Sequence, residues 1–378
     1  MTTSRRKADV SQDPLRSYTD THTDAPTPEH TLFADDLKQG TQLLDGQYTI
    51  IDFLNSGGFG ITYLARDSLD RTVVIKECFP GALCQRNGSA VRARSRKHAA
   101  ELRSFVQTFV DEARSLAKLS HPNIVGVHQV FEDNDTAYMA IDFIDGKDLQ
   151  DILESTDQAF TPDEVVVLLR KMLSAVEFIH QAGILHRDIL PDNILLDANR
   201  NPVLIDFGAA SQDLVEDTRV LTARRVVKDG YSPQEFYLTG AEQTAASDLY
   251  ALGATLHHII TGRAPPHSQR RLASVAEGAS DPYVPLDGNY PGYPPGFLAT
   301  IDLAVRVLQK DRPQSAADWI ALLPGEEAEP EPVPEPMAKV AEPATVASDF
   351  LARNFGFVIG AGTVFVLAAV VGLWQLFT

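Results

Sequence analysis

Three polar side chains in two short segments could together perform phosphoryl-transfer chemistry. Asp188 closes a His-Arg-Asp sequence, and Asn193 comes five residues later. Asp206 opens an Asp-Phe-Gly sequence behind an apolar run typical of a strand. A carboxylate such as that of Asp188 can orient an attacking hydroxyl and accept its proton, and amide and carboxylate oxygens are ligands for the metal that bridges nucleotide phosphates. The spacing therefore predicts a catalytic Asp188 and a metal site at Asn193 and Asp206.

A glycine-rich turn lies upstream, between a strand predicted at 48–54 and a second one at 61–65. Glycines let backbone amides approach phosphate oxygens because no Cβ atom stands in the way. The strand-turn-strand context differs from the strand-turn-helix setting of dinucleotide folds. Seen alone, the turn could equally be a plain hairpin. Its candidate nucleotide-binding residues are Asn55, Gly57, Gly58, Phe59 and Gly60.

Two further elements would position side chains at this site. The first is a strand at 72–77, an apolar run that contains one lysine. Seen alone, Lys76 is more typical of a surface residue at a strand edge. A helix predicted from Phe105 to Leu119 carries Glu112 on or beside its inward face, where a carboxylate favours a cation. We expect an ion pair between Lys76 and Glu112, which would serve to fix the ammonium group rather than to add stability.

The pattern changes from strands to helices after residue 146. A strand is predicted at 136–141, followed by a short connection. The segment from Glu164 to Gln181 is too apolar all round for a surface helix. We therefore expect an α+β fold in which a mostly β lobe precedes a mostly α lobe.

Between Lys76 and the helix of Glu112 lies an insertion with a basic run. A solvated basic loop and a docking surface for anionic lipid headgroups are both open interpretations. Its charged residues are Arg92, Arg94, Arg96, Lys97 and His98.

Composition excludes two other classes of protein. The 378 residues carry a formal net charge of −18, whereas affinity for nucleic acids comes largely from Lys and Arg that neutralise phosphates. We expect no nucleic-acid partner. The two cysteines, Cys78 and Cys84, are too few for a disulfide scaffold and lack a histidine spacing suited to zinc, so we expect reduced thiols.

Both ends of the chain are predicted to lie outside the folded region. Residues 1–40 are polar and lack an apolar signal-peptide core, which predicts a disordered tail. Residues 324–350 are rich in proline and glutamate, which favours an extended linker.

An apolar run without charged residues follows, and we expect a transmembrane helix at 355–377. At ~1.5 Å per residue it can cross a hydrocarbon core of ~30 Å. Lys339 and Arg353 precede the run and no charge follows it, which predicts a cytoplasmic folded region. A buried core helix is the alternative. Glycines in the run would allow two such helices to approach closely, so a homodimer through this helix stays open.

The opening motif, together with the glycine-rich turn and Lys76, resembles the eukaryotic-like protein kinase family, most of all its bacterial serine/threonine branch. The resemblance covers about residues 43–323. It implies a two-lobed protein kinase fold, with a small N-lobe at 43–142 that is mostly β with one helix, and a larger, mostly α C-lobe at 146–323.

Roles for the candidate residues follow from this resemblance. Lys76, held by Glu112, would position the α- and β-phosphates of ATP. The hinge at Asp142 and Ile144 would bind the nucleotide beside the glycine-rich turn. Mg²⁺, with Mn²⁺ as an alternative, would be the metal. The family pattern also implies that Glu235, at the end of the activation segment, pairs with Arg312.

The chain departs from the family pattern near the catalytic aspartate. Serine/threonine kinases carry lysine two residues after this aspartate, where the chain has Leu190. Lys228 lies at the place of the threonine that this lysine usually touches. We predict that Lys228 projects toward Asp188 and supplies the missing charge near the γ-phosphate, with a plain surface lysine as the alternative. Asn55 replaces the first glycine of the turn, and only a mild loss of flexibility is expected.

The resemblance implies a membrane-anchored, ATP-dependent kinase that phosphorylates Ser and Thr of proteins at the bacterial inner membrane. Autophosphorylation is expected in the activation segment, where Ser211, Thr218 and Thr222 are candidates. A nucleotide-binding pseudokinase scaffold is the alternative, motivated by Leu190 and Asn55. A small-molecule kinase shares the catalytic aspartate but is disfavoured by the long activation segment.

Overall fold

The computed structural model describes residues 35–155, 160–207, 227–238 and 240–325. All of these except Gly325 fall within one compact unit of the chain. The predicted N-terminal tail up to residue 34, the candidate phosphorylation sites and the segment 355–377 lie outside the described residues. Within the described ranges, none of the helices combines the length and the apolar character needed to cross a bilayer.

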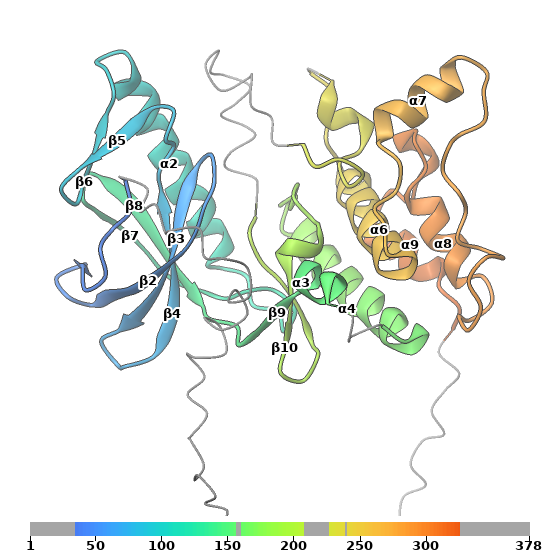
Figure 1. The fold of residues 1–378 in the computed structure, drawn as a ribbon, viewed down its shortest axis with the longest axis horizontal. Coiled ribbons are helices and arrows are strands. Elements are labelled where there is room, and N and C mark those ends of the chain that lie inside the picture. Colours follow the sequence, from blue (N-terminus) through green and yellow to red (C-terminus); the bar gives the residue numbers. More distant parts are fainter. Residues whose placement is uncertain (1–34, 156–159, 208–226, 239, 326–378) are drawn as a thin grey trace, which may run out of the picture. The chain divides into compact units, whose positions relative to one another are not determined.

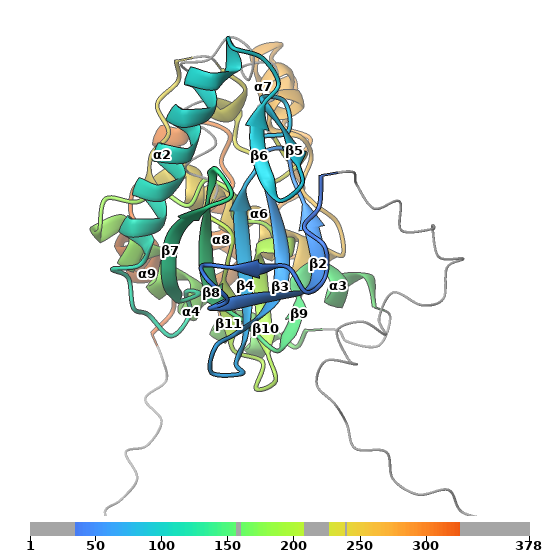
Figure 2. The same cartoon turned by 90° about the vertical axis from the view of Figure 1, so that its left-hand side faces the viewer.

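The first half of the unit is built on one antiparallel sheet of six strands, in the order β1-β2-β3-β4-β8-β7 (Figures 1 and 2). Tyr63 and Ile75, on adjacent strands, are fully buried in the core of this part, which we call the N-lobe. The strands are β1 Gln42–Leu43, β2 Tyr48–Ser56, β3 Gly60–Asp67, β4 Thr72–Cys78, β7 Val127–Asp133 and β8 Thr136–Asp142.

Helix α2 (His98–Leu116) packs beside β7 and β8 (Figure 2). The predicted helix began at Phe105, but the observed helix starts one to two turns earlier. Leu102, Phe105 and Val110 are buried on its inward face. The apolar repeat begins at Leu102. The first turn of the helix lies before this repeat, so the start of the helix could not be predicted from apolar spacing.

The insertion between β4 and α2 contains a two-stranded hairpin, β5 (Cys84–Asn87) and β6 (Ala90–Ala93), which the sequence pattern did not reveal. Two of its basic side chains are engaged within the lobe. Arg92 forms an ion pair with Asp135 at 2.8 Å, and Arg94 donates a hydrogen bond to the carbonyl oxygen of Gly81. These contacts reduce the basic charge that the insertion offers to an anionic surface.

A buried ion pair joins this hairpin to the strand that carries Lys76. The guanidinium of Arg86 contacts the carboxylate of Glu77, and both side chains are almost fully buried. The hydroxyls of Tyr63 and Tyr138 donate to the same carboxylate at 3.0 and 2.8 Å. Burial, followed by the nearby Glu77 charge, raises the pKa of both phenols, so they remain donors. The hairpin is thus fixed to the core of the N-lobe.

The start of the described chain is held by the same group of residues. Arg86 donates its backbone N–H to the Asp35 carboxylate at 2.8 Å, and its side chain contacts the Asp35 carbonyl oxygen. The backbone N–H of Leu37 donates to the Tyr63 hydroxyl, and the Leu37 side chain is 5% exposed. Residues 35–37 therefore belong to the folded N-lobe.

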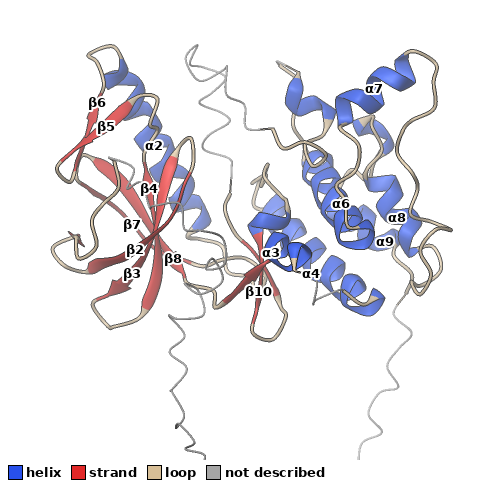
Figure 3. Ribbon diagram, in the orientation of Figure 1, coloured by secondary structure: helices blue, strands red, loops and turns tan. Residues whose placement is uncertain are grey.

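The second half, which we call the C-lobe, is mostly helical (Figure 3). Helix α4 begins at a capping box between Thr161 and Glu164, with Pro162 at its first position, and it ends before Gly183 in the left-handed region. Its buried face forms the centre of the C-lobe core with Trp319. The helices are α3 Leu149–Glu154, α4 Pro162–Gln181, α6 Ala245–Thr261, α7 Ser268–Ala276, α8 Phe297–Ala304 and α9 Ala316–Leu322.

A small sheet in the order β11-β10-β9 carries the loops of the opening motif (Figure 1). Its strands are β9 Gly146–Asp148, β10 Ile194–Asp197 and β11 Pro202–Leu204. Asn193 ends a short 3₁₀ turn immediately before β10, and Asp206 follows β11. Because β10 and β11 are antiparallel neighbours, with Ile194 opposite Leu204, the two loops lie side by side.

Candidate active site

A cavity of about 330 Å³ brings together residues of the glycine-rich turn, β4, α2 and both loops of the opening motif. Two predicted site residues, Asp142 and Ile144, are not among those that line it. The candidate residues that line it are Asn55, Gly57, Gly58, Phe59, Gly60, Lys76, Glu112, Asp188, Asn193, Asp206 and Lys228.

The loop that carries Asp188 is held from behind by Asp248 of α6. The Asp248 carboxylate accepts hydrogen bonds from the backbone N–H groups of His186 and Arg187, at 2.8 and 2.7 Å. His180 of α4 contacts the same carboxylate at 2.9 Å. Arg187 has a φ of +65°, a strained conformation for a non-glycine residue, and these bonds help to maintain it.

Asp188 and Asn193 are in direct contact. The amide nitrogen of Asn193 donates to the Asp188 carboxylate at 2.9 Å and to its carbonyl oxygen at 2.7 Å. Burial, followed by the charge of Asp206, raises the pKa of Asp188 to about 6. The side chain of Asp188 is thereby oriented and is a better proton acceptor than an exposed aspartate.

The ammonium of Lys76 lies 2.6 Å from the carboxylate of Asp206. We expected Glu112 as its partner, but among the ion pairs of the described residues Lys76 is joined to Asp206. Glu112 lines the same cavity. Desolvation in the cavity opposes ionisation of Asp206, but Lys76, with smaller effects of His186 and Lys228, lowers the pKa of Asp206 overall.

Asp206 itself has a left-handed backbone, with a φ of +58°. The next residue, Phe207, lies against the ring of the fully buried His186, with the ring centroids 4.6 Å apart. Through its Nε2 atom His186 is within hydrogen-bond distance of the carbonyl oxygen of Ile205. These contacts join the two loops and fix where the Asp206 carboxylate lies.

The glycine-rich turn is folded back toward α2. The N–H of Gly57 donates to the carbonyl oxygen of Gly60, and the ring of Phe59 stacks on Phe105 of α2 at 5.6 Å. A Cβ atom at Gly60 would lie 2.7 Å from the backbone oxygen of Glu77, so only glycine fits there. Gly58 has open space around it, which suits a backbone that must approach a ligand.

The predicted hinge residues, Asp142 and Ile144, contact other side chains and backbone groups and do not line the cavity. The Asp142 carboxylate accepts the N–H of Gly126 at 2.9 Å and lies 2.7 Å from His128. Ile144 packs against the apolar cluster that includes Met139 and Ile141. Nucleotide binding by Asp142 and Ile144 stays a prediction.

The oxygen atoms that could act as metal ligands suit a hard divalent cation, the kind of ion that nucleotide phosphates also bind. Because the amide nitrogen of Asn193 is used by Asp188, the amide oxygen is left to act as a ligand, together with the Asp206 carboxylate. The described residues hold no group of three or more His, Cys, Asp or Glu side chains suited to a metal. Mg²⁺ commonly takes only one or two protein ligands and completes its octahedron with phosphates and water.

Lys228 and Leu190 line the same cavity. Leu190 is 3% exposed, so it forms part of the apolar wall. The backbone of Lys228 is bonded to Ser232, whose hydroxyl accepts the Lys228 N–H at 2.9 Å. Sequence reasoning missed Ser232, because a lone serine near a proline carries no signal for such a bond.

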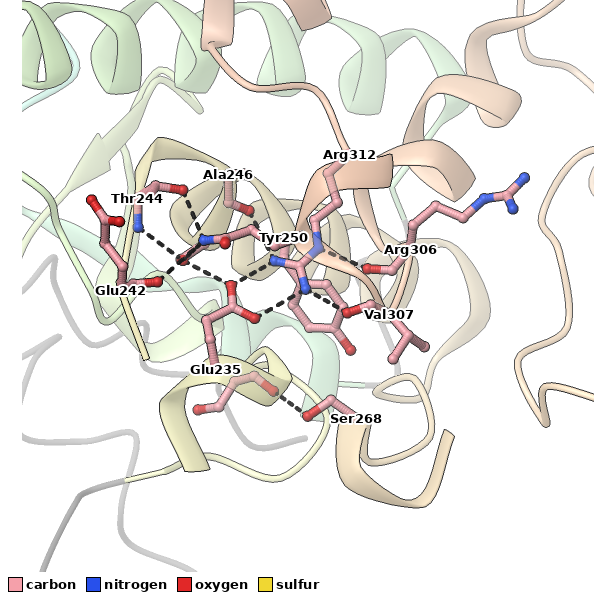
Figure 4. A network of polar contacts seen from close by, with 12 residues as sticks. Glu235, Glu242, Thr244, Ala246, Tyr250, Ser268, Arg306, Val307 and Arg312 are labelled. Atoms are coloured by element: carbon pink, nitrogen blue, oxygen red, sulfur yellow. Dashed lines mark hydrogen bonds and ion pairs between the residues drawn. The ribbon is translucent and has the colours of Figure 1, made fainter. Parts of the chain in front are cut away.

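The end of the activation segment is fixed by the buried ion pair that the family resemblance implied (Figure 4). Arg312 contacts the Glu235 carboxylate through both terminal nitrogens, at 2.7 and 3.2 Å. It also donates to the carbonyl oxygens of Arg306 and Val307. The Ser247 hydroxyl donates to Glu235 at 2.8 Å. Glu235 and Arg312 are 3% and 4% exposed, so the pair belongs to the C-lobe core.

The chain is similar to known proteins. The family model described as protein kinase domain matches residues 48–283. Serine/threonine-protein kinase PrkC of Bacillus subtilis is 31% identical over 223 residues, which are 59% of this chain and 31% of that protein. Serine/threonine-protein kinase C of Synechocystis sp. is 31% identical over 294 residues, which are 75% of this chain and 50% of that protein.

A solved structure described as PpkA-294 apo form superposes with a TM-score of 0.65 at 35% identity, and covers 77% of this chain and 100% of that chain. The chain spans between about a third and a half of the length of the curated relatives named above.

Proposed function

We propose that this chain, which belongs to the protein kinase family, transfers the γ-phosphate of ATP to serine and threonine hydroxyls of proteins. The observation that carries the proposal is the convergence of Lys76, Asp188, Asn193 and Asp206 on one cavity beneath the glycine-rich turn. The curated relatives named above are serine/threonine-protein kinases, which supports this acceptor class.

Each residue has a role that its position allows. The glycine-rich turn would cover the phosphates, and Lys76 would pair with the α- and β-phosphates. Asn193 and Asp206 would hold Mg²⁺, which when bound neutralises phosphate charge. Asp188 accepts the proton of the attacking hydroxyl. The new bond joins the hydroxyl oxygen to the γ-phosphorus, and the bond from that phosphorus to the bridging oxygen breaks, with its electron pair left on ADP.

The direct test is incubation of the purified chain with γ-labelled ATP, Mg²⁺ and a casein-type acceptor. We expect phosphoserine or phosphothreonine in the acceptor, together with added mass on the chain itself from autophosphorylation. Chelation of Mg²⁺ should abolish both signals. A chain that binds ATP, as measured by calorimetry, but transfers no phosphate would instead be a pseudokinase scaffold, the alternative that Leu190 motivates. A chain that modifies only free small molecules would also contradict the proposal.

Membrane attachment is a second part of the proposal. The run at 355–377 contains no charged residue and is long enough to span a bilayer, which supports an anchor at the bacterial inner membrane with the kinase unit in the cytoplasm. The glycines of this segment would let two copies approach closely within a membrane, so a homodimer through the segment depends on its spanning the bilayer.

Substitution within the run tests this attachment. Val366→Arg with Ala369→Arg should release the chain from washed membranes, because each arginine at a helix centre costs about 2.5–3.5 kcal/mol on insertion scales. Ala341→Arg with Ala344→Arg, in the linker, is the matched control and should leave the chain bound. Recovery of the unmodified chain in the soluble fraction would contradict the anchor.

A further inference from the structure

The cavity is poor in positive charge where a nucleotide would bring several negative ones. Among the described residues that line it, only Lys76 and Lys228 are cationic. Lys76 is engaged by Asp206 and is predicted to serve the α- and β-phosphates. At the wall position two residues after Asp188, where the family resemblance implies a lysine, the chain has the buried, apolar Leu190. Lys228 is therefore the one described cation left for the γ-phosphate.

Lys228 lines the cavity together with Asp188 and Asp206. Burial and the charge of Asp206 raise the pKa of Asp188, and the positive charge of Lys228 opposes this rise; the same charge adds to the larger effect of Lys76 in lowering the pKa of Asp206. Of the two lysines that line the cavity, Lys76 has an ion pair with a described carboxylate, and Lys228 has none among the described residues. The position of Lys228 at the cavity does not depend on these pKa values.

The backbone at Lys228 is held in a tight turn. Its carbonyl oxygen accepts the N–H groups of Tyr231 and Ser232, at 3.1 and 2.9 Å. Its own N–H donates to the Ser232 hydroxyl at 2.9 Å. Gly230 in this turn has a φ of +87°, and a Cβ atom there would lie 2.8 Å from the backbone oxygen of Pro265. These bonds and the close approach to Pro265 define the backbone conformation of the turn.

Ser232 connects this turn to helix α7. Its carbonyl oxygen accepts the hydroxyl of Ser268, the first residue of α7, at 2.8 Å (Figure 4). Ser232 and Ser268 are 6% and 1% exposed, so the bond between them is buried, whereas the bond from Lys228 to Ser232 is partly buried. A buried hydroxyl that bonds the N–H of Lys228 is well placed to determine where that side chain begins.

We propose that Lys228 binds the transferring γ-phosphoryl group in place of the lysine absent at Leu190, and that Ser232 is the residue that positions it. The inference rests on the proposed kinase function. Lys228 exchanges no proton in the step. Its ammonium stabilises the negative charge on the phosphoryl oxygens while the hydroxyl proton goes to Asp188 and the electron pair of the broken bond stays on ADP.

The first experiment compares Lys228→Ala with the exchange variant Leu190→Lys/Lys228→Ala. Lys228→Ala should lower kcat by about 10²–10³-fold, the size typical of one lost electrostatic donor. The exchange variant should regain at least tenfold, because a lysine at 190 would extend from the cavity wall. Lys310→Ala, at an exposed lysine of the C-lobe, is the matched control and should keep full activity.

A binding measurement gives a readout that does not depend on turnover. The affinity for a β,γ-imido analogue of ATP should fall in Lys228→Ala, whereas the affinity for ADP should not, because ADP has no γ-phosphate. Activity of Lys228→Ala within threefold of wild type, or an equal loss of affinity for both nucleotides, would overturn the inference. Absence of transfer by the wild-type chain would instead overturn the proposed function, and the binding arm would still report on Lys228.

The role of Ser232 is tested by non-additivity. Ser232→Ala should lower kcat about tenfold in the wild-type background and have no further effect on Lys228→Ala, because residues in one interaction network are coupled. A purely structural serine would lower activity equally in both backgrounds. That outcome would remove Ser232 from the proposal.

Discussion

Asp188→Asn is expected to lower kcat for phosphate transfer by about 10²–10⁴-fold, the range that general-base catalysis contributes. The asparagine keeps the shape of the side chain, so its contact with the amide nitrogen of Asn193 can be retained. It cannot accept the proton of the attacking hydroxyl. The affinity for ATP should change little, because the predicted nucleotide contacts come from Lys76, the glycine-rich turn and the metal ligands.

The measurement is steady-state transfer to a protein acceptor, with ATP affinity measured separately by calorimetry. Asp70→Asn is the matched control, since Asp70 is exposed in the turn between β3 and β4. Its φ of +59° is a conformation that asparagine tolerates well. Transfer by Asp188→Asn within tenfold of wild type would mean that another group accepts the proton.

Arg312→Met should cost about 3–5 kcal/mol of unfolding free energy, because it leaves the buried carboxylate of Glu235 without its cation. This is a large part of the ~5–15 kcal/mol that stabilises a typical domain. The guanidinium also satisfies the carbonyl oxygens of Arg306 and Val307 and lies 4.7 Å from the ring of Tyr250. Methionine replaces some of this packing but none of the hydrogen bonds.

Urea denaturation followed by circular dichroism measures this effect. The double variant Glu235→Gln/Arg312→Met should be more stable than the single one, because it removes the charge that was left buried. A single variant that loses less than 1 kcal/mol, or a double variant that is less stable than the single, would show that the pair is not a stabilising element of the C-lobe.

Much of the fold could be predicted where apolar spacing is regular. The hairpin of β2 and β3, the strands β4 and β8 and the helix α4 lie within a few residues of their predicted positions. The β5–β6 hairpin could not be predicted, because its strands are only four residues long and its place depends on tertiary contacts, such as the buried ion pair between Arg86 and Glu77 and the burial of Val91. Such contacts leave no periodic pattern in the sequence of the hairpin.

The candidate site was predicted from motif spacing, and all its residues except Asp142 and Ile144 line one cavity. The partner of Lys76 could not be predicted in the same way. Two carboxylates are available to this ammonium, Glu112 on α2 and Asp206 after β11, and spacing along the sequence does not determine which lies closer. The link from Lys228 through Ser232 to α7 was also beyond prediction, because it depends on a tertiary hydrogen bond.

The contacts of Asp35 and Leu37 have a consequence for where the domain begins. The match to the protein kinase family model starts at residue 48. The physical unit starts earlier, since Leu37 fills part of the N-lobe core and Asp35 is bonded to Arg86. A shortened form of the protein for crystallisation or drug screening should therefore begin no later than Asp35. A form that begins at residue 48 would lack Leu37 and so leave a gap in the hydrophobic core.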